Sequence, residues 1–217
     1  MSELNNIALK IIGNGKGILA ADESNGTMTK RLEDVNVQSN PENRLLFRET
    51  LFTSVKMKDC IGGVILYDET IKQSSKSGKK IPELISDLNS VTGIKVDTGA
   101  KILANSKEEK ITEGLDGLRE RLNEYYKLGA RFTKWRSVHT ISDKYPSKLS
   151  IHTNAHALAR YSALVQECGM VPIVEPEVLM DGNHSAEDCY KKTSEIIKKC
   201  FDELEIHKID LKGVILK

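Results

Sequence analysis

Gly213-Val214-Ile215-Leu216-Lys217 shows within five residues the pattern from which the architecture follows. Its small and apolar residues are typical of a short buried strand, and a lysine stands at the carboxyl end of that strand. The same pattern recurs in Gly17–Ala21 before Asp22, Gly63–Tyr67 before Asp68, Gly93–Ile94 before Lys95, Ala130–Thr133 before Lys134 and Val171–Val174 before Glu175. The sequence therefore predicts six short strands, each ending in charge.

Helical segments separate the predicted strands. Apolar residues recur at spacings of three and four in residues 3–12, 114–128 and 158–168, and in a segment capped by Ser185 and Asp188. Asn40-Pro41 is a further helix start, because asparagine caps backbone N–H groups and proline suits the first helical position. Helix and strand alternate at intervals of roughly 30–45 residues, which indicates βα units with parallel strands. A parallel α/β barrel has this pattern, and its site lies at the carboxyl ends of the strands.

The composition excludes several classes of partner. Lys and Arg number 32 and Asp and Glu 31, so no excess of charge favours nucleic acid or an anionic membrane. The apolar runs have the length of strands, and residues 1–6 lack the basic and apolar regions of a signal peptide. The four cysteines form no CxxC pair. A chain of 217 residues with this composition is expected to form one domain and to work in the reducing cytoplasm.

Several motifs are more specific than any hydrophobic pattern. They are Gly15–Ser24 (GKGILAADES), Gly62–Leu66 (GGVIL), Gly93–Asp97 (GIKVD), Lys134–Arg136 (KWR), Ile173–Glu177 (IVEPE) and Leu216-Lys217. In this order, the chain closely resembles the class I fructose-bisphosphate aldolases. The resemblance implies a (β/α)₈ TIM barrel and a glycolytic lyase that splits fructose 1,6-bisphosphate reversibly through a lysine Schiff base. It also implies a phosphorylated sugar as substrate, no metal or other cofactor, and a homo-oligomer, typically a tetramer.

The resemblance assigns catalytic roles to five residues. Lys217 matches the lysine that forms the Schiff base, and Glu175 and Glu177 match the paired acids at the end of their strand. Lys134 matches a cation beside the substrate, and Asp22 matches the acid of the first strand. An Asp22–Lys134 pair is a hypothesis that follows from these positions.

Four further residues are assigned to substrate binding. Arg136 matches the second cation beside the substrate, and Lys95 also has its counterpart in the family. Ser24 and Thr27 fall where the family places hydroxyls near a phosphate, with threonine in place of the usual serine at position 27. Both lie after the first strand near a turn, from which hydroxyls can donate hydrogen bonds to a phosphate.

The resemblance covers a partial barrel. Family members continue beyond the Schiff-base lysine through two more strands and a carboxyl-terminal tail, whereas this sequence has about six βα units in residues 1–217. Six strands cannot close an eight-stranded barrel, so the first and sixth strands are expected to be open edges. The 217 residues alone are therefore expected to be aggregation-prone and essentially inactive.

The chemistry explains why these residue types occur together. Cleaving the C3–C4 bond of a ketose leaves negative charge on carbon, and a protonated imine accepts that charge far better than a carbonyl. An ordinary lysine amine is almost wholly protonated at neutral pH, and desolvation or a neighbouring cation favours its neutral, nucleophilic form. Lys134 or Arg136 beside Lys217 would serve this purpose, and Glu175 would shuttle protons.

Other interpretations of single residues were weighed. Lys95 and Asp97 lie two apart on a strand and share a face, so a simple ion pair remains open. His152 and His156 have a helical spacing that can bind zinc, but the sequence shows no third ligand, which favours surface histidines. Trp135 is expected to pack. At the level of function, the alternatives are another Schiff-base barrel lyase and an inactive chain that retains binding or assembly surfaces.

Overall fold

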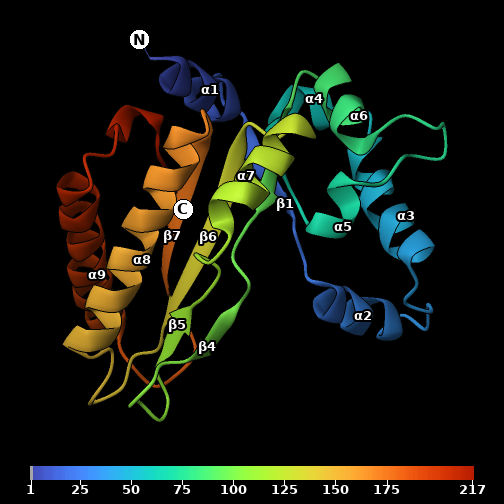
Figure 1. The fold of residues 1–217 in the computed structure, drawn as a ribbon. Helices are drawn as coiled ribbons and strands as arrows, with labels where there is room; N and C mark the ends of the chain where they lie inside the picture. The colour runs from blue at the N-terminus through green and yellow to red at the C-terminus, as the bar shows by residue number, and fades with distance from the viewer. Residues whose placement is uncertain (1) are drawn as a thin grey trace.

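The computed structural model describes residues 2–217, with a parallel sheet at its centre. The strands of this sheet are β1 (Gly17–Ala21), β2 (Ile61–Leu66), β3 (Val91–Lys95), β6 (Phe132–His139), β7 (Val171–Val178) and β8 (Ile215–Leu216). They pair in the order β1-β2-β3-β6-β7-β8, and every neighbouring pair is parallel (Figure 1). Two short strands, β4 (Ala100–Ile102) and β5 (Lys110–Thr112), form a separate antiparallel hairpin.

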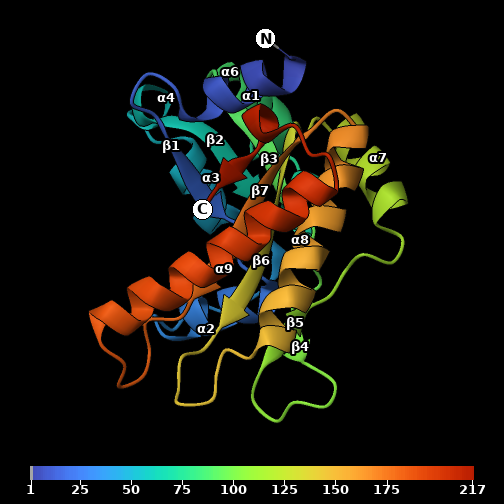
Figure 2. The ribbon, with the colours of Figure 1, turned by 90° about the vertical axis from the view of Figure 1, so that its left-hand side faces the viewer.

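Helices surround the sheet, most of them on its outer face. They are α1 (Glu3–Ile12), α2 (Asn25–Glu33), α3 (Pro41–Phe52), α4 (Met57–Cys60), α5 (Asp68–Ile71), α6 (Ile81–Asp87), α7 (Leu118–Lys127), α8 (Lys148–Glu167) and α9 (Ala186–Ile206), with a 3₁₀ turn at Leu211–Gly213. The long helices α8 and α9 lie side by side, α8 against β6 and β7 and α9 against β7 (Figure 2). Within residues 2–217, no helix combines the length and the apolar character needed to cross a membrane.

The predicted helix starts are confirmed by their caps. The Asn40 side chain accepts a hydrogen bond from the Asn43 backbone N–H, and Pro41 opens α3. Ser185 and Asp188 form a reciprocal capping box at the start of α9, in which each side chain accepts from the other residue's backbone N–H. These caps fix where the chain turns from strand to helix.

Two apolar clusters hold the strands in place. The larger one fills the space between the sheet and its helices, around residues such as Trp135, Tyr161 and Leu158. The smaller one lies inside the curved sheet and includes Ile11 of α1 and Phe132 of β6. Because α1 covers this inner cluster, the opposite, carboxyl ends of the strands remain accessible (Figure 1).

Some predicted boundaries were wrong. The sequence placed charged residues after the strands, but β6 continues through Lys134 and Arg136 to His139, and β7 continues through Glu175 to Val178. The reason is that these two strands pair with each other over their full length, from Phe132–Val171 to His139–Val178. The hairpin β4–β5 and the short helices α2, α4, α5 and α6 were not predicted.

The sheet curves but does not close. β1 and β8 are the two edge strands, as the partial-barrel prediction required. The described residues therefore form an α/β fold with six parallel strands, an incomplete TIM barrel.

Candidate active site

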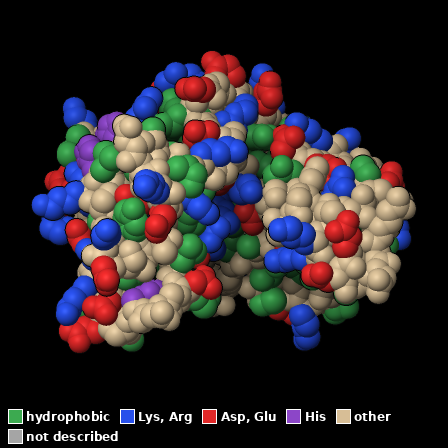
Figure 3. Space-filling model, turned by 90° about the horizontal axis from the view of Figure 1, so that it is seen from below, with side chains coloured by type: hydrophobic (Ala, Val, Ile, Leu, Met, Phe, Trp, Pro, Cys, Tyr) green, Lys and Arg blue, Asp and Glu red, His purple; other side chains and the backbone are tan. Residues whose placement is uncertain are grey.

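A hollow lies at the carboxyl ends of the strands. It has a volume of about 460 Å³ and receives side chains from β1, β3, β6 and β7, and from Lys217. Viewed onto this face, the hollow lies at the middle of the molecule, with basic and acidic side chains gathered in it (Figure 3). All of the predicted site residues line it: Asp22, Ser24, Thr27, Lys95, Lys134, Arg136, Glu175, Glu177 and Lys217.

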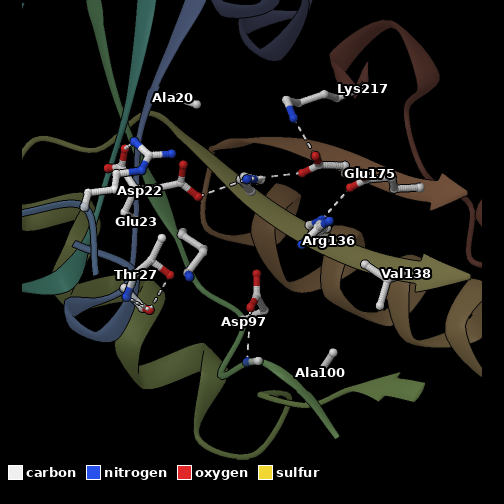
Figure 4. Close-up of a pocket in the computed structure, with 16 residues that line it drawn as sticks. Ala20, Asp22, Glu23, Thr27, Asp97, Ala100, Arg136, Val138, Glu175 and Lys217 are labelled. Atoms are coloured by element: carbon white, nitrogen blue, oxygen red, sulfur yellow. Dashed lines mark hydrogen bonds and ion pairs between the residues drawn. The ribbon is translucent and has the colours of Figure 1, made fainter. Parts of the chain in front are cut away.

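A chain of ionic contacts crosses the centre of the pocket. Lys134 Nζ donates to Asp22 Oδ2 at 3.0 Å, which confirms the hypothesised pair. The same Nζ lies 3.3 Å from Glu175 Oε2, where the charges attract without a well-aligned hydrogen bond. Lys217 Nζ donates to the other oxygen of Glu175 (Figure 4). Glu175 therefore links the two amines.

Strand geometry explains this convergence. Lys134 on β6 and Glu175 on β7 lie two residues apart in register, since Arg136 is the partner of Glu175 and Lys134 that of Ile173. Lys134 and Arg136 are two residues apart and so point to the same side of the sheet. Both side chains consequently enter the pocket instead of the surrounding helical layer.

Burial makes the centre of this network unusual. Lys134, Asp22 and Glu175 are each exposed by 7% or less. Burial acts to lower the pKa of Lys134, but the charges of Asp22 and Glu175 outweigh it and raise that pKa above its usual value. Lys134 is therefore a fixed cation. The Lys217 side chain, by contrast, is 42% exposed and accessible from the pocket.

A second ion pair lies beside the first network. Arg136 Nε donates to Glu177 Oε2, and this hydrogen bond raises the pKa of Arg136 and lowers the pKa of Glu177. Both groups are thus charged near neutral pH. In this geometry Glu177 holds the guanidinium at the wall of the pocket.

The N-terminus of α2 forms the far wall. Ser24 caps this helix, and its Oγ accepts from the Thr27 backbone N–H at 3.3 Å and lies 3.1 Å from Thr27 Oγ1. The first backbone N–H groups of a helix and its dipole attract anions. With Lys95 and Arg31 also on the lining, this end of the pocket suits a phosphate group.

Lys95 and Asp97 both line the pocket but do not form the simple pair that was left open. Lys95 Nζ lies 5.3 Å from the centre of the Tyr67 ring, and within residues 2–217 no ion pair joins it to Asp97. Asp97 accepts from the Gly99 backbone N–H, and burial raises the pKa of its carboxyl despite the nearby Lys95 charge.

Sequence reasoning assigned no site role to three polar residues of the pocket, Glu23, Arg31 and Asp97, although Asp97 was weighed as a partner of Lys95. Glu23 belongs to the quoted Asp22-Glu23-Ser24 string, and Asp97 to the quoted GIKVD motif, so the sequence held a signal for both. Arg31 lies on α2, a helix that was not predicted, and it pairs with Glu23. Nothing in the local pattern pointed to Arg31.

Comparison with known proteins identifies the same family that the sequence motifs indicated. The family model for class-I fructose-bisphosphate aldolase matches residues 3–217. A probable fructose-bisphosphate aldolase class 1 of Xylella fastidiosa is 50% identical over 217 residues, which is all of this chain and 65% of that protein. The cytosolic fructose-bisphosphate aldolase 6 of Arabidopsis thaliana is 47% identical over 203 residues, 94% of this chain and 57% of that protein. The chain thus spans less than two thirds of the length of these curated relatives.

A solved structure extends the agreement to three dimensions. The fructose-bisphosphate aldolase of Plasmodium falciparum, crystallised with TRAP and a small-molecule inhibitor, superposes with a TM-score of 0.96 at 44% identity. The superposition covers 99% of this chain and 62% of the Plasmodium chain. Sequence and fold lead to one conclusion: the chain belongs to the class I fructose-bisphosphate aldolase family.

Proposed function

We propose that the protein containing this chain cleaves fructose 1,6-bisphosphate reversibly into dihydroxyacetone phosphate and glyceraldehyde 3-phosphate, a reaction of glycolysis, through a Schiff base on Lys217. The observation that carries the proposal is the hydrogen bond of Lys217 Nζ to Glu175, whose second oxygen lies 3.3 Å from the buried Lys134 ammonium. An accessible amine beside a carboxylate and a fixed cation has the parts that imine formation requires.

Imine formation is the first chemical stage. Lys217 Nζ attacks C2 of the ketose, forming a C–N bond and a carbinolamine. Glu175 first takes a proton from the Lys217 ammonium, which frees the amine to attack. A proton then moves from nitrogen to the C2 oxygen to give the carbinolamine, and Glu175 returns its own proton to that hydroxyl, which leaves as water. The product is a protonated imine, whose positive charge the enzyme uses in the next stage.

Carbon–carbon cleavage follows. Loss of the C4 hydroxyl proton to a base breaks the C3–C4 bond, releases the aldehyde and moves the electron pair into the imine as an enamine. Asp22 holds Lys134 through their 3.0 Å hydrogen bond, and Lys134 stabilises developing negative charge. Protonation of the enamine at C3 and hydrolysis of the imine then restore the amine of Lys217.

The phosphates of the substrate are proposed to bind at the edges of the pocket. Ser24 and Thr27 offer hydroxyls at the N-terminus of α2, and Lys95 and Arg136 offer positive charge. Glu177 orients Arg136 by accepting its hydrogen bond. These contacts hold the ketose with C2 toward Lys217.

Reductive trapping tests this function. Dihydroxyacetone phosphate and borohydride should label the protein covalently on Lys217, as located by mass spectrometry of the digested protein, and Lys217→Met should remove the label. Lys95→Met, a change to another lysine of the same pocket, should retain it. Labelling that survives Lys217→Met and maps to Lys134 or Lys95 would refute the assignment. Labelling on Lys217 with products other than the two triose phosphates would indicate another Schiff-base lyase.

The proposal also covers the cellular location and the oligomeric state of the protein. We propose a cytoplasmic location, supported by the name of the cytosolic Arabidopsis relative, and a tetramer for the complete protein, as is typical of the family. Fractionation of cells and the sedimentation of the purified protein test these two statements separately.

A further inference from the structure

A second polar cluster lies on the outer helical layer, away from the pocket. His152 and His156 stand four apart on α8, and His207, which caps α9, stands four residues after Glu203 of that helix. Because residues four apart share one face of a helix, each helix presents two side chains to its neighbour. The later part of α9 lies against α8, whereas the start of α9 diverges from it (Figure 2). The structure thus supplies the third and fourth partners that the sequence lacked for the two histidines of α8.

Distances within the cluster are short. His156 Nδ1 lies 3.2 Å from Glu203 Oε2, and His152 Nδ1 lies 3.3 Å from Glu203 Oε1. His207 Nδ1 lies 4.0 Å from Glu203 Oε2, and one ligand atom from each of His156, Glu203 and His207 lies within 4.8 Å of the others. With Zn–N and Zn–O bonds of about 2.0–2.1 Å, tetrahedral ligand atoms are about 3.4 Å apart. His156 and Glu203 already fit this spacing, and the His207 ring must move inward to bring a ligand nitrogen from within 4.8 Å of them to that distance.

Glu203 is the anchor of the cluster. Its carboxylate is nearly buried, with 5% of the side chain exposed, whereas the side chains of His152 and His156 are about half exposed, at 56% and 45%. Burial acts to raise the pKa of Glu203, but hydrogen bonds from Lys199 and His156 hold that pKa below its usual value. An ionised carboxylate is thus surrounded by imidazoles at the surface.

We propose that His156, Glu203 and His207 bind a divalent transition metal ion of the Zn²⁺ type. Imidazole and carboxylate without thiolate suit Zn²⁺, and the half-exposed histidines give the ion access from solvent. The site belongs to the helical layer and is independent of the proposed reaction in the pocket.

His207 also makes a hydrogen bond that is typical of a metal-binding histidine. Its Nδ1 lies 2.9 Å from the backbone carbonyl oxygen of Glu203, to which an Nδ1–H donates. Metal-binding histidines commonly donate one ring N–H to a carbonyl in this way, which leaves the other nitrogen for the ion. The rings of His156 and His207 are in a T-shaped arrangement with their centres 5.0 Å apart, so both histidines lie beside the Glu203 carboxylate.

Lys199 is the competitor for the site. Its Nζ donates to Glu203 Oε1 at 2.7 Å and occupies the oxygen nearest His152. Oε2 is the oxygen that faces His156 and His207, so a metal ion can bind there while Lys199 stays on Oε1. Removing the lysine would free Oε1 and favour participation of His152. An ion at this point would clamp α9 to α8 behind β7.

Metal titration of the chelator-treated, purified protein tests the proposal. Isothermal titration calorimetry with Zn²⁺ should give one site per chain, and His156→Ala and His207→Ala should each weaken binding by about tenfold or more. Circular dichroism checks that the variants fold. His184→Ala, a histidine outside the cluster, is the matched control and should bind as the parent does. Lys199→Gln should bind Zn²⁺ at least as tightly as the parent.

The outcomes are distinct. Absence of saturable binding, or binding that folded His156→Ala and His207→Ala proteins both retain, would overturn the proposal and place any bound ion elsewhere, such as on the pocket carboxylates. Weaker binding by Lys199→Gln would overturn the assigned geometry. Co²⁺ provides a second readout, because a tetrahedral site should give visible absorption bands that His156→Ala abolishes.

Discussion

Glu175 couples the two amines of the pocket, and this coupling defines a kinetic prediction. Glu175→Gln and Lys134→Ala act on charge that develops during the reaction, so each should lower kcat by about 10²–10⁴-fold with a much smaller effect on KM. Steady-state cleavage of fructose 1,6-bisphosphate by the complete protein measures both constants.

A binding residue provides the contrast for that experiment. Thr27→Val removes a hydroxyl from the proposed phosphate subsite while keeping the shape of the side chain, and it should mainly raise KM. If Glu175→Gln changed only KM in the same way, Glu175 would hold substrate and not move protons.

His139, at the end of β6, makes stability depend on pH. It is 2% exposed, and burial lowers its pKa from 6.5 to about 4, against the attraction of Glu109. Between these values the unfolded chain binds a proton that the folded chain does not, so stability is lost as the pH falls from 6.5 towards 4. The full effect is about 3 kcal/mol.

The experiment uses the single tryptophan as its probe. Trp135 is fully buried, so its fluorescence reports unfolding by urea. His139→Gln removes the titrating group, and its unfolding free energy should fall less steeply between pH 6.5 and pH 4 than that of the parent. Parallel pH profiles for the two proteins would show that His139 takes up its proton equally in the folded and unfolded states, and would contradict a lowered pKa.

At the scale of elements, the predicted strand ends lie within one residue of the observed ends except in β6 and β7, which continue further. Gly17–Ala21 was predicted to the residue, because glycine marks its start and Asp22 its end. In β6 and β7 the charged residues are internal, since Lys134 and Glu175 face a pocket that only the assembled sheet creates. Short alternating runs carry too little pattern to predict β4 and β5.

The contact of α1 with β2 gives a prediction for packing. A Cβ on Gly62 would lie 2.0 Å from the Ile11 carbonyl oxygen, which is backbone and cannot turn aside. Gly62→Ala should therefore push α1 off the inner cluster and destabilise the fold by about 1–3 kcal/mol or more.

Gly17→Ala is the matched control in β1. A Cβ there meets nothing within 4 Å, so the change should be neutral or stabilise by up to about 1 kcal/mol. Urea unfolding followed by Trp135 fluorescence compares the two variants. Equal stability of Gly62→Ala and the parent would mean that α1 is not seated against β2.

At the scale of the whole molecule, a parallel fold explains why motif residues far apart in sequence meet. Asp22 and Lys134 are 112 positions apart in sequence, yet both lie toward the carboxyl ends of parallel strands of the same sheet. The family resemblance named every predicted residue of the pocket, because its motifs stand at these strand ends. It could not indicate the cluster around Glu203, whose two helices meet only in the folded structure.

Open edges of the sheet determine how residues 1–217 behave alone. β1 and β8 present unpaired backbone groups, and Leu216 on β8 is 44% exposed. Such edges pair with other chains, so the 217-residue polypeptide should self-associate with rising concentration and show little aldolase activity. Light scattering across a concentration series measures this self-association directly.

Leu216→Lys should reduce association, because a charged side chain on an edge strand opposes pairing with another chain. Leu46→Lys, at 43% exposure on α3, is the control and should have little effect. A monomeric polypeptide that unfolds cooperatively and cleaves fructose 1,6-bisphosphate at the rate of a complete aldolase would contradict this prediction, because its edges would then need no partner.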